Sequence, residues 1–84
     1  MKDTTNFFRD QRVKLNLNLT QMAARCGATA QTVLNWESDV SVPSPTVETL
    51  AKAYEVSESR MERELMAQRR RIERRREANM AAAG

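Results

Sequence analysis

The sequence predicts an all-α fold of five helices, the last of them extended by an arginine-rich segment. Three observations lead to this fold class. Apolar residues recur at helical spacing throughout the chain, and no run alternates in the way of a half-buried strand. Capping residues and one internal glycine divide this pattern into short helices. From position 58 onward, nothing stops a helix for about twenty residues.

The composition disfavours most kinds of active site. The chain has 84 residues, no histidine, one cysteine and two glycines, which fits one small domain with a modest core. Imidazole catalysis, a disulfide framework, a cysteine-based zinc site and a glycine loop for phosphate all lack their residues. No apolar run suits a bilayer, and no charged-then-apolar leader is present. We therefore expect a cytoplasmic protein that is no enzyme, binds no metal or cofactor, and has no membrane span or signal peptide.

The excess charge of the chain lies in its last third. Residues 1–57 contain six basic and six acidic residues, whereas residues 58–84 contain eight arginines and five glutamates. The whole formal charge of +3 therefore belongs to the second segment. Such an asymmetry indicates a polyanionic partner or an interaction tail.

The first helix should run from about Asn6 to Leu15, with Thr4 or Thr5 as its N-cap. The residues Asn-Leu-Asn at 16–18 then break the pattern. Asparagine tolerates a left-handed turn and is also a good N-cap for a following helix.

Two short helices follow, joined by a glycine turn. The first is expected from Leu19 to Cys26, with Asn18 as its N-cap. Gly27 suits the left-handed position just past a helix end. Thr29 then caps a third helix, which should run from Ala30 to about Ser38.

This third helix has two different faces. Val33, Trp36 and Glu37 share one side at i, i+3, i+4 spacing, which predicts the side that packs on the core. The opposite side consists of Ala30, Gln31, Leu34 and Asn35.

A fourth and a fifth helix complete the pattern. The loop at 38–45 ends in Ser44-Pro45, a start signal with proline at the first helical position. Ser57 caps the fifth helix, and Glu58 lies in its first turn, where a carboxylate suits the helix dipole. The apolar side of the fourth helix repeats at i, i+3, i+4, i+7 as Val47, Leu50, Ala51 and Tyr54.

Two short helices joined through a glycine turn describe a helix-turn-helix. The segment LNLTQMAARCGATAQTVLNWE, residues 17–37, resembles the DNA-binding domain of the phage Cro and lambda-repressor type, also called the xenobiotic-response-element type. That family has an alanine at the position of Ala23, a glycine at Gly27, a valine or isoleucine at Val33, and often Trp-Glu at the helix end. The resemblance covers about residues 7–61, including LAKAYEVS at 50–57.

The resemblance implies that the helix from Ala30 to Ser38 lies in the major groove of DNA. Gln31 and Asn35 would read bases, because a primary amide pairs with both N6 and N7 of adenine. Ala30 and Leu34 would touch thymine methyl groups. Helix N-termini suit phosphates, and the expected phosphate contacts are Asn18, Thr29, Thr32 and Ser38.

In some members of the family, residues at the positions of Arg12 and Glu37 form a largely buried ion pair between the first helix and the recognition helix. Loss of one partner leaves a buried charge without its counter-ion. The resemblance therefore implies that Arg12→Ala weakens DNA binding by loosening the fold.

Two features differ from the family pattern. The loop at 38–45 contains Asp39 and no positive charge, where the family often has lysine or arginine. Leu19 stands where a glutamine commonly binds a phosphate. We therefore expect few phosphate contacts from the residues around the recognition helix.

We divide the chain into a DNA-binding domain at 1–66 and an arginine-rich helical extension at 67–84. Three interpretations of the extension are open. It contacts the DNA backbone or a minor groove, or it lengthens a dimerisation helix through Met61, Leu65 and Ile72, or it is a solvated end. The candidate DNA contacts in the extension are Arg69, Arg70, Arg71, Arg74, Arg75 and Arg76.

The sequence thus predicts a transcriptional repressor, of phage or mobile-element type, that binds a two-fold operator in double-stranded DNA as a homodimer. Two other classes stay open. An antitoxin-like or adaptor module would bind a protein partner with the same fold. An arginine-rich RNA binder would use mainly residues 69–76.

Overall fold

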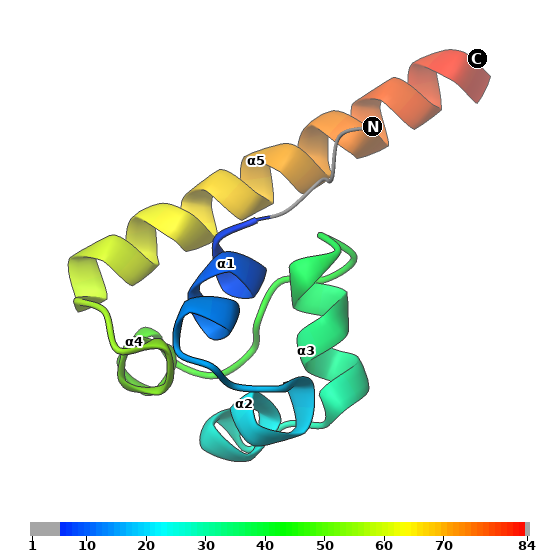
Figure 1. Ribbon diagram of the computed structural model, residues 1–84. Helices are drawn as coiled ribbons and strands as arrows, with labels where there is room; N and C mark the ends of the chain where they lie inside the picture. Colours follow the sequence, from blue (N-terminus) through cyan, green and yellow to red (C-terminus); the bar gives the residue numbers. More distant parts are fainter. Residues whose placement is uncertain (1–5, 84) are drawn as a thin grey trace.

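The computed structural model describes residues 6–83, and this part of the chain is all-α (Figure 1). Its five helices are α1 (Phe7–Lys14), α2 (Leu19–Cys26), α3 (Ala30–Glu37), α4 (Val47–Tyr54) and α5 (Glu58–Ala83). The predicted fold class is confirmed.

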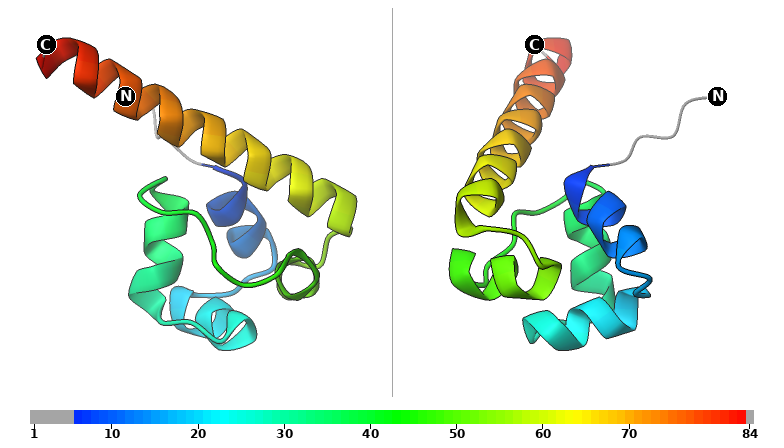
Figure 2. Two further views of the ribbon diagram at one scale, coloured as in Figure 1. Left: turned by 180° about the vertical axis from the view of Figure 1, so that it is seen from behind. Right: turned by 60° about the vertical axis from the view of Figure 1, so that its left-hand side comes forward.

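The long helix α5 lies at one end of the domain, and α2 lies at the other. In Figure 1 and the left view of Figure 2, α5 crosses over α1 and α4. Its 26 residues span roughly 39 Å at 1.5 Å per residue, close to the 41 Å long dimension of the structure. The C-terminal part of α5 projects beyond the side of the domain on which α3 lies.

All five helices contribute to one core. Phe8, Met22, Trp36, Tyr54 and Met61 come from different helices, and each is at most 1 % exposed. Full burial of such a side chain contributes about 1.5–3 kcal/mol. Because both large aromatic side chains of α3 and α4 are among them, these rings pack in the core and present no surface on which a base stacks.

The turn between α2 and α3 forms as the sequence predicts. Gly27 has a φ of +67°, the left-handed conformation that glycine adopts without steric strain. Asn18 and Gln21 form a capping box at the start of α2. At the start of α3, the hydroxyl of Thr29 accepts a hydrogen bond from the N–H of Thr32 at 3.1 Å.

The predicted cap of the first helix is wrong. Asn6 is the N-cap of α1, and its Oδ1 accepts a hydrogen bond from the N–H of Arg9 at 3.2 Å. Thr4 and Thr5 lie outside the described residues. Asparagine is at least as good an N-cap as threonine, so residue type alone did not decide between neighbouring positions.

The predicted start of the fourth helix is also wrong. α4 begins at Val47 rather than at Pro45. The hydroxyl of Thr46 accepts a hydrogen bond from the N–H of Thr49 at 3.2 Å, and this makes Thr46 the N-cap. A satisfied side-chain cap therefore prevails over the preference of proline for the first helical position.

The stripe of α5 that we considered for dimerisation faces its own domain. Met61, Leu65 and Ile72 are at most 8 % exposed, and Gln68 between them is fully buried. Their spacing of 4, 3 and 4 residues places them on one side of the helix. This stripe therefore packs against the core of its own chain. The helix also continues without a break across the expected boundary at residues 66 and 67.

Candidate nucleic-acid interface

The outer side of α3 presents the four residues that the sequence singled out as base readers. Gln31 and Leu34 are exposed, and Ala30 and Asn35 are partly exposed. Nε2 of Gln31 donates a hydrogen bond to Oδ1 of Asn35 at 3.0 Å. One amide therefore orients the other, and the bond leaves Oε1 and one N–H of Gln31 available to a partner.

The N-terminal ends of α2 and α3 carry the expected phosphate contacts. Asn18 and Thr29 are exposed N-caps. The Oδ1 atom of Asn18 accepts the N–H of Gln21 at 2.8 Å, so its amide NH2 group stays available as a donor. The hydroxyls of Thr29 and Thr32 lie 2.8 Å apart. Ser38 is exposed at the other end, as the C-cap of α3.

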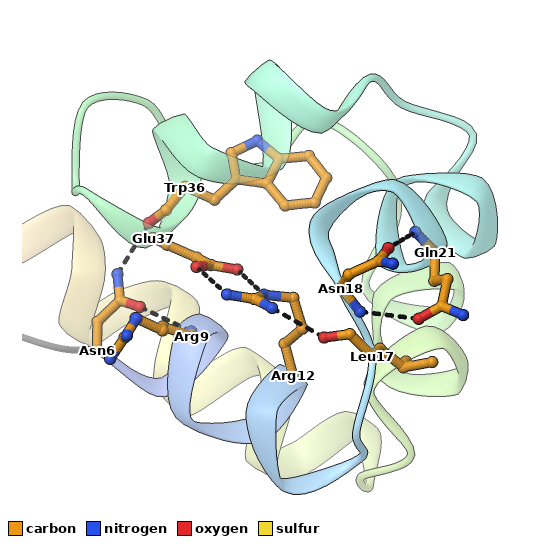
Figure 3. Close-up of polar contacts among 8 residues, drawn as sticks. All are labelled: Asn6, Arg9, Arg12, Leu17, Asn18, Gln21, Trp36 and Glu37. Atoms are coloured by element: carbon orange, nitrogen blue, oxygen red, sulfur yellow. Dashed lines mark hydrogen bonds and ion pairs between the residues drawn. The ribbon is translucent and has the colours of Figure 1, made fainter.

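Behind this surface, Arg12 and Glu37 form a bidentate ion pair (Figure 3). Nε of Arg12 lies 2.6 Å from Oε2 of Glu37, and Nη2 lies 3.1 Å from Oε1. The two side chains are 13 % and 2 % exposed. Nη1 of Arg12 also donates to the carbonyl of Leu17 at 2.8 Å. The hydrogen bond to Glu37 outweighs burial and raises the pKa of Arg12.

The C-terminal end of α3 is held by two amides from distant parts of the chain. The carbonyl of Trp36 accepts a hydrogen bond from Nδ2 of Asn6 at 2.8 Å and another from Nε2 of Gln68 at 2.9 Å. Gln68 also donates to the carbonyl of Ser41 at 3.2 Å. These residues join α1, α5 and the loop after α3 at one point.

Asp39 completes this polar cluster. Its carboxylate accepts two hydrogen bonds from Arg71, at 2.8 and 3.2 Å, and one from Nδ2 of Asn6 at 2.9 Å. Burial alone would raise the pKa of Asp39, but the hydrogen bonds from Arg71 and Asn6 outweigh it and hold the pKa below its ordinary value. The negative charge of the loop is therefore neutralised inside the protein.

A comparison with known families identifies the fold of this part of the chain. The family model described as helix-turn-helix matches residues 8–61, nearly the range of the resemblance seen in the sequence. The chain belongs to the Cro/C1-type helix-turn-helix family. No curated protein and no solved structure is significantly similar to the chain. The family is one of DNA-binding transcription regulators. α3 is the second helix of the helix-turn-helix, which is the position of the recognition helix in this motif, and we use that name for it below.

The arginines of the extension lie outside the helix-turn-helix match, and they differ in their surroundings. Arg71 is engaged with Asp39. Arg69 and Arg76 line an open cavity of about 390 Å³ next to the loop after α3. Arg75 lines another cavity, beside the end of the recognition helix. Arg70 and Arg74 are exposed and line neither cavity.

Sequence reasoning missed two residues of this site, Asn6 and Gln68, and it missed the role of a third, Asp39. Their partners are 27 to 33 positions away in the chain, and no local pattern pairs them.

Within residues 6–83, no helix is long and apolar enough to cross a bilayer. In the same range, no group of three His, Cys, Asp or Glu side chains is placed to hold a metal ion.

Replacing Arg12 with methionine should lower the free energy of unfolding by about 3–5 kcal/mol, because Glu37 is then buried without its counter-ion. Urea unfolding of the wild type and Arg12→Met measures this loss. The control is the double variant Arg12→Met/Glu37→Met, which leaves no buried charge and should lose less than the single variant. Equal stability of wild type and Arg12→Met would contradict a structural role for the pair.

Asp39→Asn should reduce the sensitivity of the protein to acid. The pKa of Asp39 is lower in the folded than in the unfolded state, so its contribution to stability is complete above about pH 5 and is lost as the pH falls through the folded pKa. The thermal midpoints of wild type and variant should therefore converge between about pH 5 and the acid limit. Arg71→Gln, which removes the ion partner, should converge likewise. A difference in midpoint that is constant across this range would show that Asp39 has no such role.

Proposed function

We propose that the protein is a sequence-specific repressor that binds a two-fold DNA operator as a homodimer. The observation that carries the proposal is the exposed, hydrogen-bonded amide pair of Gln31 and Asn35 on the recognition helix. A helix of this family docks with its N-terminal residues against base edges, and Gln31 lies in the first turn of α3. The ion pair of Arg12 and Glu37 supports the helix from behind.

Base reading follows from the chemistry of the two amides. Oε1 of Gln31 accepts from N6 of adenine while its second N–H donates to N7. The hydrogen bond to Asn35 fixes the plane of the Gln31 amide before DNA arrives, which lowers the entropy lost on binding. Asn35 keeps its own NH2 group for a neighbouring base. Ala30 and Leu34 supply apolar contact for thymine methyl groups.

Phosphate contacts flank the readers on both sides. Thr29 and Thr32 place hydroxyls at the N-terminus of α3, where the positive end of the helix dipole also favours an anion. Asn18 offers its amide NH2 group at the start of α2, and Ser38 offers a hydroxyl at the end of α3. These contacts fix the position of the protein on the duplex and carry no sequence information.

A symmetric dimer would read two half-sites about one DNA turn apart. Such a complex represses by covering a promoter. We assign the protein to the compact regulators of phages or mobile elements, which act at the nucleoid. An antitoxin-like partner interaction or RNA binding by the arginines is an alternative outcome of the experiment that follows.

Selection from random duplex DNA at near-physiological salt should enrich an inverted repeat. Gln31→Ala and Asn35→Ala should each lose about 1–3 kcal/mol of discrimination at one base pair per half-site, measured as competition between the selected site and single-base variants. Asn79→Ala, which removes an exposed amide from α5, is the control and should keep full specificity.

Two results would contradict the proposal. One is strong binding of DNA or RNA that shows no sequence preference and is unchanged in Gln31→Ala and Asn35→Ala. The other is selection of a DNA site whose base preferences are the same in both variants and the wild type.

A further inference from the structure

An open cavity lies beside the C-terminal end of the recognition helix. It has a volume of about 470 Å³ and is lined by residues from α1, α3 and α5. Leu34 and Ser38 contribute from the end of the recognition helix, Arg9 from α1 and Arg75 from α5. The cavity therefore adjoins the surface that we assign to the DNA major groove.

The cavity has an excess of positive charge. Its two carboxylates, Glu37 and Asp39, are engaged in ion pairs with Arg12 and Arg71. Arg9 and Arg75 are exposed, and neither has an ion-pair partner among residues 6–83. Two guanidinium groups that have no counter-ion within residues 6–83 thus lie at one opening.

The fold fixes the side on which each of these arginines lies. Arg9 follows the buried residues Phe7 and Phe8 in the first turn of α1. Arg75 stands three positions after Ile72 and seven after Gln68, both of which face the domain. Residues at these spacings share one side of a helix, so Arg75 continues the inward stripe of α5 at the point where the helix passes α3.

We propose that Arg9 and Arg75 together bind the sugar-phosphate backbone of the DNA that α3 reads. The inference rests on the proposed function. The loop after α3 has no positive charge from residue 38 to 45, and Asp39 within it is neutralised by α5. Arg9 and Arg75 supply, from α1 and α5, the cations that this loop lacks. A guanidinium group matches phosphate in both charge and hydrogen-bond geometry.

The direction of α5 suits this role. Its C-terminal part projects past the side of the domain that carries α3 (Figures 1 and 2). A duplex lying against the outer side of α3 would therefore come closest to α5 near the C-terminal end of α3. Arg75 is the extension arginine that shares a cavity with the residues there.

The opposite side of α5 offers a matched control. Arg63 and Arg70 are seven residues apart, exposed and without an ion-pair partner in the described part of the chain. Their helical positions place them away from the buried stripe of Met61, Leu65 and Ile72. Arg70 was a candidate contact from the sequence alone, but its place on the outer side of α5 leaves it out of the contacts that we propose. The double variant Arg63→Gln/Arg70→Gln removes the same charge as Arg9→Gln/Arg75→Gln.

The test measures affinity for duplex DNA as a function of salt concentration for the wild type and the two double variants. Each phosphate contact contributes about 0.9 to the slope of log K against log salt. Arg9→Gln/Arg75→Gln should lower the slope by roughly 2 and weaken binding of all sequences alike, so the ratio of specific to non-specific affinity stays constant. Arg63→Gln/Arg70→Gln should keep the slope of the wild type. Equal slopes in all three proteins, or equal losses in both variants, would overturn the proposal.

Two further arms identify the source of the loss. Thermal midpoints of both double variants should equal that of the wild type, because the four side chains are exposed and none forms an ion pair with a described residue. A large fall in Arg9→Gln/Arg75→Gln alone would overturn the proposal in favour of a structural role. In a second arm, neutral methylphosphonates replace the phosphates that flank the half-site. This replacement should lower the salt slope of the wild type, and it should leave the already lower slope of Arg9→Gln/Arg75→Gln unchanged. If the arginines hold only free phosphate ions, this substitution leaves the wild type unchanged and the proposal fails.

The two proposals fail in different ways. The salt slope can be measured on random duplex DNA as well as on a selected site. A wild type that binds all DNA sequences equally would contradict the proposed function. A salt slope on a selected site that is the same in Arg9→Gln/Arg75→Gln as in the wild type would contradict only the present inference.

Discussion

The carbonyl of Trp36, at the end of the recognition helix, is the point on which the arrangement of the domain depends. It accepts hydrogen bonds from Asn6, the cap of α1, and from Gln68 in the middle of α5. The last carbonyls of a helix have no partner within the helix, and α3 has no basic residue in its last turn. Beside the N–H of Asp39 at 3.3 Å, the donors come from α5 and from the cap of α1. A change in the angle of α3 would therefore leave buried polar groups unpaired.

The polar cluster at the end of α3 fixes the orientation of this helix in a domain whose apolar core is small. Apolar contacts stabilise the helices against one another but tolerate small rotations, whereas hydrogen bonds and ion pairs have preferred geometries. Arg12 with Glu37, and Arg71 with Asp39, fix α3 and its following loop against α1 and α5. Because an ion pair in the interior contributes little net stability, we assign these pairs mainly to the orientation of the recognition helix. This orientation determines whether Gln31 and Asn35 meet base edges.

The sequence predicted the helices and the turn because their signals are local. Asn18, Gly27 and Thr29 act on residues within one turn of themselves, and the i, i+3, i+4 pattern of α3 lies within eight residues. The sequence did not decide which of several neighbouring residues caps a helix, and the observed caps Asn6 and Thr46 differ from the predicted ones. The cluster at the end of α3 was beyond sequence reasoning, because Asp39 and Arg71 are 32 positions apart and six arginines surround the helix at 69–76. The burial of Gln68 and Ile72, which the sequence does not show, identifies the side of α5 that faces the domain and hence the arginines nearest to α3.

Amide hydrogen exchange in the free protein tests this account most directly. The N–H groups of Ser38 and Val40 bond to the carbonyls of Leu34 and Asn35 at the surface end of α3. If the cluster holds this end, they should exchange as slowly as the amide of buried Val33, through unfolding of the whole domain. The exposed amides after residue 76 in α5 should exchange much faster. Exchange of the Ser38 and Val40 amides at the rate of those α5 amides would show that the end of α3 opens locally, and would contradict the central role of the cluster.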